Sequence, residues 1–197
     1  MIRIGLLAGF LAFAAAPAAA DEEEVARYVD SLSDQTLALL GEDIPEDERL
    51  EGFRALIDRH LATEALAPAL LGPVWERAAP EEQEAFRDAF EESMIAQFAP
   101  MFEQDVDVEV AVRDVEPRDP RGYNAELDLE GIHGIPTVAV HVIETNDSRY
   151  QVADVTFGGI RMFYVLRQEY RAYLNRHGGD IMALVEELRD RTDLPSN

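Results

Sequence analysis

The middle of the chain alternates between apolar and polar residues, and this pattern constrains the fold more than any other feature of the sequence. Residues 105–112 read DVDVEVAV, and residues 123–129, 138–142 and 153–157 alternate in the same way. A period of two places the apolar side chains on one face of a β-strand. The stretches PRDPRG, EGIHGIP and TNDS between these segments are typical of turns. The sequence therefore predicts a curved, four-stranded antiparallel meander with one apolar face.

Segments with a helical period flank this region on both sides. Apolar residues recur every three or four positions within residues 25–32, 50–60 and 80–102, and again within residues 162–174 and 181–188. Blocks of helices and strands in this order are typical of an α+β fold. We expect N-terminal helices, the sheet and then C-terminal helices, with an apolar pocket enclosed between them.

The helix predicted to begin at Pro80 carries a row of large, soft side chains. The row consists of Phe86, Phe90, Met94, Phe98 and Phe102. In most proteins such a row faces the core. Here the valines and alanines of the predicted strands are small enough to leave room beside it, and methionine adapts its shape to a ligand. Both interpretations, core and pocket wall, remain open from the pattern alone.

The first twenty residues have the pattern of a secretory signal peptide. Arg3 precedes an apolar run, and three alanines end at Ala20. The alternative is an uncleaved anchor, but the run is shorter than the about 20 residues that a bilayer span needs. We expect cleavage after Ala20, release into the periplasm, a single domain over residues 21–192, and a frayed tail over residues 193–197.

The charge of the chain limits its partners. The formal net charge is −23, and it becomes −24 when Arg3 is removed. Such a chain repels nucleic acid and anionic headgroups, so we expect no nucleic-acid binding and only transient membrane contact through partner proteins. There is no cysteine, which excludes disulfides, thiol catalysis and cysteine metal sites.

Catalytic and metal-binding motifs are missing from the sequence. The four histidines, His60, His133, His141 and His177, are far apart and lack a ligand spacing. His141 alternates with apolar neighbours, so we expect it to be exposed. No nucleophile elbow or phosphate-binding loop occurs. We therefore predict no catalytic residue, no metal and no cofactor, and Asp154 is the one acid that an enzyme could use.

Two long stretches resemble the MlaC family, also known as the toluene-tolerance family of periplasmic lipid-binding proteins. The first runs from Leu70 to Phe102, and the second from Val152 to Leu188. The matching positions are Leu71-Gly72, Val74-Trp75, Ala79-Pro80-Glu81 and the Phe86/Phe90 row, then Asp154-Val155, Gly159-Ile160, Glu169-Tyr170 and Gly179-Asp180. The chain departs from the family at Tyr150, where a tryptophan is usual, and at Arg161, where a serine is usual.

The resemblance implies a soluble carrier of phospholipid. Such a protein shuttles lipid between an outer-membrane lipoprotein–porin complex and an inner-membrane ABC transporter with a lipid-binding ring, which maintains outer-membrane lipid asymmetry. The residues that we expect to contact acyl chains are Trp75, Phe86, Phe90, Met94, Phe98, Met101, Phe102, Val138, Val140, Val142, Val155, Phe157, Ile160 and Met162. Arg161 is the position at which we expect contact with an anionic headgroup.

Three other functions remain open from the sequence. A carrier of a hopanoid or another isoprenoid needs the same apolar pocket. An enzyme on a cone-shaped α+β fold needs a buried acid or base, for which Asp154 is the candidate. A chaperone or pure interaction protein needs only an exposed apolar surface.

Overall fold

Helices precede and follow an antiparallel sheet, as the sequence predicts. The computed structural model describes residues 18–40, 44–98, 108–119, 121–130, 137–146 and 149–192. The elements are α1 (Ala18–Ala38), α2 (Glu46–His60), α3 (Thr63–Leu71), the 3-10 helix η1 (Gly72–Arg77), α4 (Pro80–Phe98), β1 (Glu109–Asp119), β2 (Gly122–Glu130), β3 (Val138–Glu144), β4 (Tyr150–Phe157), β5 (Ile160–Arg161), α5 (Met162–Arg176) and α6 (Ile181–Thr192). The α+β prediction is confirmed.

The sheet is a meander in the order β1-β2-β3-β4-β5, with antiparallel neighbours throughout. The four long strands match the prediction, and β5 adds two residues that the alternating pattern does not mark. Strand β1 continues through Pro117 to Asp119, into the stretch that was predicted as a turn. Because β1 is an edge strand, the missing N–H of Pro117 costs less there than within the sheet.

A β-bulge in β4 changes which residues share a face. His141 pairs with Asp154, but Val142 pairs with Val152, so Ala153 is an extra residue on β4. Val152 and Val155 therefore lie on the same face although they are three positions apart. The alternation in the sequence predicts that Ala153 shares a face with Val155. In the structure, Val152 shares that face instead.

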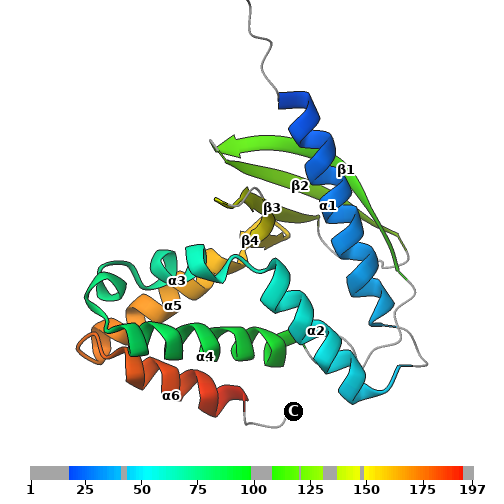
Figure 1. Ribbon diagram of the computed structural model, residues 1–197. Helices are drawn as coiled ribbons and strands as arrows, with labels where there is room; N and C mark the ends of the chain where they lie inside the picture. Colours follow the sequence, from blue (N-terminus) through cyan, green and yellow to red (C-terminus); the bar gives the residue numbers. More distant parts are fainter. Residues whose placement is uncertain are drawn as a thin grey trace, which may run out of the picture.

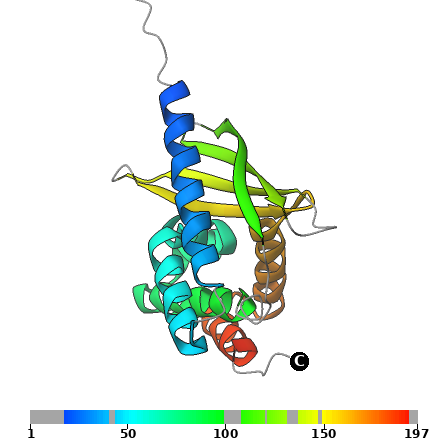
Figure 2. The ribbon, with the colours of Figure 1, turned by 90° about the vertical axis from the view of Figure 1, so that its right-hand side faces the viewer.

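Helix α1 lies along the sheet, and the other helices form a layer next to it (Figure 1). Val25 and Val29 are fully buried from α1 against residues of the sheet. The carboxylate of Asp30 accepts a hydrogen bond of 3.2 Å from the backbone N–H of Val112, which joins α1 to the edge strand β1. In the view of Figure 2, α1 and α2 stand on one side of the molecule and α5 on the other, with the sheet across the top.

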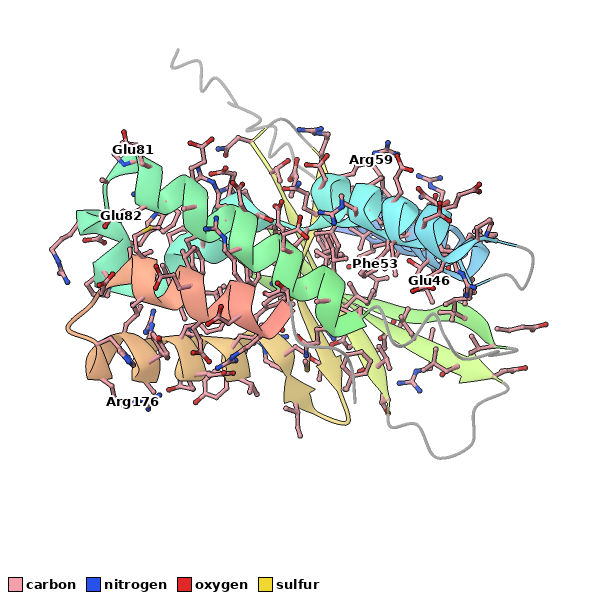
Figure 3. The ribbon with its side chains drawn as sticks, turned by 90° about the horizontal axis from the view of Figure 1, so that it is seen from below. Glu46, Phe53, Arg59, Glu81, Glu82 and Arg176 are labelled. Atoms are coloured by element: carbon pink, nitrogen blue, oxygen red, sulfur yellow. The ribbon has the colours of Figure 1, made fainter. Side chains whose placement is uncertain are left out.

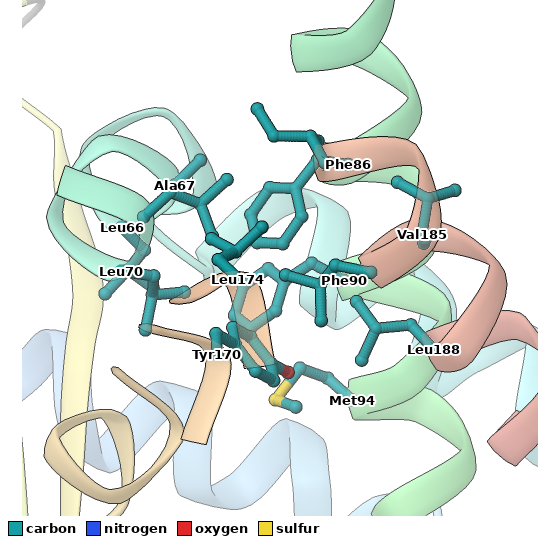
Figure 4. Close-up of a cluster of buried hydrophobic side chains, with 14 of the residues drawn as sticks. Leu66, Ala67, Leu70, Phe86, Phe90, Met94, Tyr170, Leu174, Val185 and Leu188 are labelled. Atoms are coloured by element: carbon teal, nitrogen blue, oxygen red, sulfur yellow. The ribbon is translucent and has the colours of Figure 1, made fainter. Parts of the chain in front are cut away.

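The helical layer has a core of its own, separate from the cluster that α1 forms with the sheet. Helix α4 packs on α6, and α3 packs on α5. Phe86 and Phe90 are fully buried, and Tyr170 meets Phe86 edge-on at a ring-centroid distance of 6.1 Å (Figure 4). Leucines and a valine of α3, α5 and α6 complete this cluster. Its aliphatic and aromatic contacts hold the helices of this layer together.

One prediction about a single residue is wrong. His141 is buried instead of exposed, because β3 is a central strand that is covered on both faces. Helix α3 also contains a proline, Pro68. The helix begins at Thr63, so the absent N–H of Pro68 removes only one hydrogen bond near the start of a short helix.

Candidate ligand-binding cavity

A large apolar cavity lies between the sheet and the helices. Its volume is about 500 Å³, and α1, α2, α4, α5 and the four long strands all contribute to its walls. Of the 26 residues that line it, 22 are apolar and none is charged. The valines of the sheet form one wall, since small side chains on a curved sheet do not fill the space up to the helices.

The helical walls come from amphipathic segments that the sequence does not relate to one another. Helix α1 contributes Leu32 and Leu37, and α2 contributes Phe53 and Leu56. Figure 3 shows Phe53 turned from α2 toward the interior, whereas Arg59 of the same helix lies on the outside. Residues of α1 and α2 were absent from the predicted site. Their helical spacing shows that each helix has an apolar face, but spacing alone does not reveal what that face covers.

The polar side chains in the wall are Ser33, Thr36, His60 and Gln97. The Nδ1 atom of His60 lies 3.1 Å from the hydroxyl of Tyr28. Burial raises the pKa of Tyr28, so the hydroxyl stays protonated at neutral pH. The tautomer of His60 sets which of the two groups donates the hydrogen bond. Burial and the nearby Arg59 lower the pKa of His60, which favours the uncharged ring. The cavity wall is thus electrically neutral at pH 7.

The structure divides the predicted site residues into four groups. Seven line the cavity, namely Met94, Phe98, Val138, Val140, Val155, Phe157 and Met162. Four lie in packed clusters instead, namely Trp75, Phe86, Phe90 and Val142. Ile160 is 61 % exposed at the surface. Met101 and Phe102 lie outside the described residues. The row on α4 therefore has a core half and a cavity half, because only the end of α4 nearer Phe98 reaches the space under the sheet.

Arg161 takes part in a different arrangement. Its Nε atom donates to Asp154 over 2.6 Å, and the second oxygen of Asp154 accepts a 3.0 Å bond from the N–H of Phe163 at the start of α5. Asp154 is 1 % exposed. Both residues line a second, smaller cavity of about 120 Å³, and neither lines the large one. Asp154 thus holds the beginning of α5 against β4.

The geometry suits the binding of an elongated apolar molecule. Among the residues that the structure describes, no three His, Asp or Glu side chains are grouped as a metal ion would require. An engineered cavity of about 150 Å³ takes up benzene, with six carbon atoms. By the same scale, a cavity of 500 Å³ accommodates roughly 20 carbon atoms, about the size of one acyl chain.

Within the described ranges, no helix has the length and apolar content for a membrane span.

Comparison with known proteins agrees with this fold. A family model for the MlaC protein matches residues 30–190. No curated protein sequence matches the chain. A solved structure of a phospholipid-binding protein from Ralstonia solanacearum, in complex with a phospholipid, superposes with a TM-score of 0.72. The sequences are 18 % identical, and the match covers 85 % of this chain and 96 % of that one. The family model spans most of the chain and the architecture agrees, so this chain belongs to the MlaC family.

Proposed function

We propose that this protein is a carrier that binds phospholipid through its acyl chains. The observation that supports this most is the large cavity, which has an almost wholly apolar wall and no charged residue. Membership of the MlaC family supports it independently, as does the solved relative from Ralstonia solanacearum, which holds a phospholipid. We propose no catalytic step.

The size of the cavity bears on how lipid is held. Burial of one methylene group contributes about 0.8 kcal/mol, so a chain of roughly 14 methylenes gains about 11 kcal/mol on leaving water. The described cavity suits one such chain. A second chain requires the walls to move apart, and α1 and α2 are the natural elements to move because they close the cavity from one side of the sheet.

The wider role that we propose is transport across the periplasm. The protein takes lipid from an outer-membrane lipoprotein–porin complex or an inner-membrane ABC transporter, and delivers it to the other, which maintains outer-membrane lipid asymmetry. Export would be accompanied by cleavage after Ala20, which lies in the first turn of α1. The net charge of −23 supports a freely diffusing carrier that approaches membranes through partner proteins.

Solvent extraction of the purified protein, followed by mass spectrometry, tests the proposal. We expect phospholipid in the extract and uptake of labelled phospholipid from vesicles by the delipidated protein. A polycyclic isoprenoid in the extract would assign the cavity to a hopanoid-type ligand instead. Absence of any lipid together with no uptake would contradict the carrier function.

A single substitution tests the place of binding. Val155 lies on the cavity face of β4, and its replacement in Val155→Trp fills part of the cavity. We expect lipid uptake to fall at least fivefold while the fold is retained. Thr156→Trp is the matched control, because Thr156 is the next residue on the same strand and does not line the cavity. Equal uptake by both variants would show that lipid binds elsewhere.

A further inference from the structure

The segment that forms β5 and α5 is basic although the protein as a whole is strongly acidic. Residues 160–176, which form β5 and α5, contain four arginines and one glutamate, a net charge of +3. Since the whole chain carries −23, the remaining residues carry −26. The one glutamate, Glu169, is paired with Arg191 of α6. The basic character of β5 and α5 is therefore not cancelled within the segment itself.

Exposed apolar side chains gather on the same segment. Within the described part of the chain, four large apolar side chains are exposed, and three of them are Ile160, Tyr164 and Val165. Single exposed apolar residues are common, but neighbouring ones often mark a contact surface. We call Ile160, Arg161, Tyr164, Val165 and Arg167 the α5 patch. The tight turn at Gly158 and Gly159, with φ of +56° and +81°, places Ile160 at its edge.

The patch has a hollow lined by arginines. The cavity of about 120 Å³ is lined by Arg161, Arg167, Tyr164 and Asp154, together with apolar side chains of α3 and β4. Arg161 is paired with Asp154, whereas the buried Nε of Arg167 has no hydrogen-bond partner among the described residues. The guanidinium of Arg167 lies over the ring of Tyr164, 5.2 Å from its centroid. One positive charge therefore remains unmatched at this hollow.

We propose that the α5 patch is the surface on which an acidic segment of a partner protein docks, with one of its carboxylates at Arg167 and an apolar neighbour against Tyr164. Arginine and tyrosine are the side chains that most often carry binding energy at protein interfaces. At physiological ionic strength, charges interact over about 8 Å, so the positive charge of Arg167 acts mainly on groups close to the hollow. The inference rests on the proposed function, in which the partner is a membrane complex that exchanges lipid with this carrier.

A protein segment fits the patch better than a bilayer does. An anionic membrane presents its charge over a wide area, which the net charge of −23 opposes. An acidic loop brings few charges, and a single side chain can enter a hollow of 120 Å³.

The patch lies on a helix that also borders the large cavity. Helix α5 contributes Met162, Phe163 and Leu166 to the large cavity, and Phe163 lines both cavities. A partner docked on α5 therefore contacts the helix that forms a wall of the lipid site.

The test measures binding of the full mature chain to nanodiscs that contain either the inner-membrane transporter or the outer-membrane lipoprotein–porin complex of the same cell. The patch variant is Tyr164→Asp/Arg167→Glu, which leaves the Asp154–Arg161 pair intact. The matched control is Met182→Asp/Arg189→Glu on α6, which changes an exposed apolar residue and an exposed arginine in the same way. We expect the patch variant to bind at least one complex tenfold or more weakly, and the control to bind within twofold of the wild type.

Four results would overturn the proposal. In the first, the wild type binds neither complex, and in the second, the patch variant binds as well as the wild type. In the third, the control variant is weakened as much as the patch variant. In the fourth, the wild type binds empty anionic nanodiscs and the patch variant does not, which would assign the patch to a lipid surface. Thermal unfolding verifies that the variants fold, and Arg167→Gln serves as a milder second variant. Lipid uptake is measured separately. A wild type that docks but takes up no lipid would refute the carrier function and leave the docking surface supported.

Discussion

Asp154 joins the sheet to the C-terminal helices through both of its carboxylate oxygens. One oxygen accepts from Arg161 and the other from the backbone N–H of Phe163. A buried carboxylate of this kind costs desolvation energy, which its two charge-assisted hydrogen bonds offset. The position is therefore structural in the first place, although a search of the sequence for an acid or base singles it out.

We expect Asp154→Ala to lower the free energy of unfolding by about 2–3 kcal/mol, since it leaves the N–H of Phe163 without an acceptor and Arg161 without its partner. Asp154→Asn keeps an oxygen for Phe163 and should cost less. Urea denaturation of both variants measures this. Equal losses would mean that the ion pair, and not the bond to Phe163, dominates. Lipid uptake by Asp154→Asn should match the wild type, and unchanged uptake would argue against an enzyme that uses this acid.

We expect His60 to make the stability of the protein depend on pH. Its pKa is lowered in the folded state, first by burial and then by Arg59, so below about pH 6.5 the unfolded chain binds more protons than the folded one. The stability that comes from the neutral ring is complete above pH 6.5 and declines as the pH falls from there toward the folded pKa. We expect the wild type to lose more stability between pH 7.5 and 5.5 than His60→Gln, measured by urea denaturation. Parallel losses would exclude His60 as the cause.

Helix α4 has two functions along its length. Phe86 and Phe90 lie in the core with α5 and α6, while Phe98 lines the cavity and meets Phe53 of α2 at 6.1 Å. The same row of side chains thus supports the helical layer at one end and forms part of the cavity wall at the other. The division follows from where the sheet lies over α4, not from any change in the sequence pattern.

Substitutions along α4 should separate these functions. We expect Phe90→Ala to lower the free energy of unfolding by about 3–5 kcal/mol, as for other large-to-small changes in a packed core. Phe98→Ala should cost less than half as much, since its side chain borders an open space, but should reduce lipid uptake. Denaturation and uptake are measured on each variant. If the stability losses were equal, the cavity would be collapsed around Phe98 in solution.

At the scale of the whole molecule, the cavity of about 500 Å³ is large enough for a bound ligand to affect the stability of the fold. A ligand that binds only the folded state stabilises it by about 2.7 kcal/mol at a hundredfold excess over its Kd. For a protein of this size, each kcal/mol shifts Tm by about 2–4 °C. We therefore expect delipidated protein to unfold roughly 5–10 °C below the loaded form in a calorimetric scan, and to regain the difference when phospholipid is added. An unchanged Tm would indicate that lipid does not occupy the interior.

The order and type of most elements follow from the sequence, although α3, η1 and β5 were not predicted. Periodicity is a local property, and the change from 3.6 to 2 and back is enough to predict helices, a four-stranded meander and more helices. It also marked the soft row on α4 and the valines of the sheet, of which Met94, Phe98, Val138, Val140 and Val155 line the cavity. No residues have the spacing of a catalytic or metal-binding motif, so the sequence favoured a carrier over an enzyme.

The tertiary structure alone decided which apolar faces meet one another and which border a space. Periodicity identifies an apolar face but not its partner, so Trp75 and Phe86 could not be assigned to the core, nor Leu32 and Phe53 to the cavity. The bulge at Ala153 turned Val152 inward, and the covering of both sheet faces buried His141. Each of these outcomes depends on contacts between segments far apart in the chain, which no local pattern encodes.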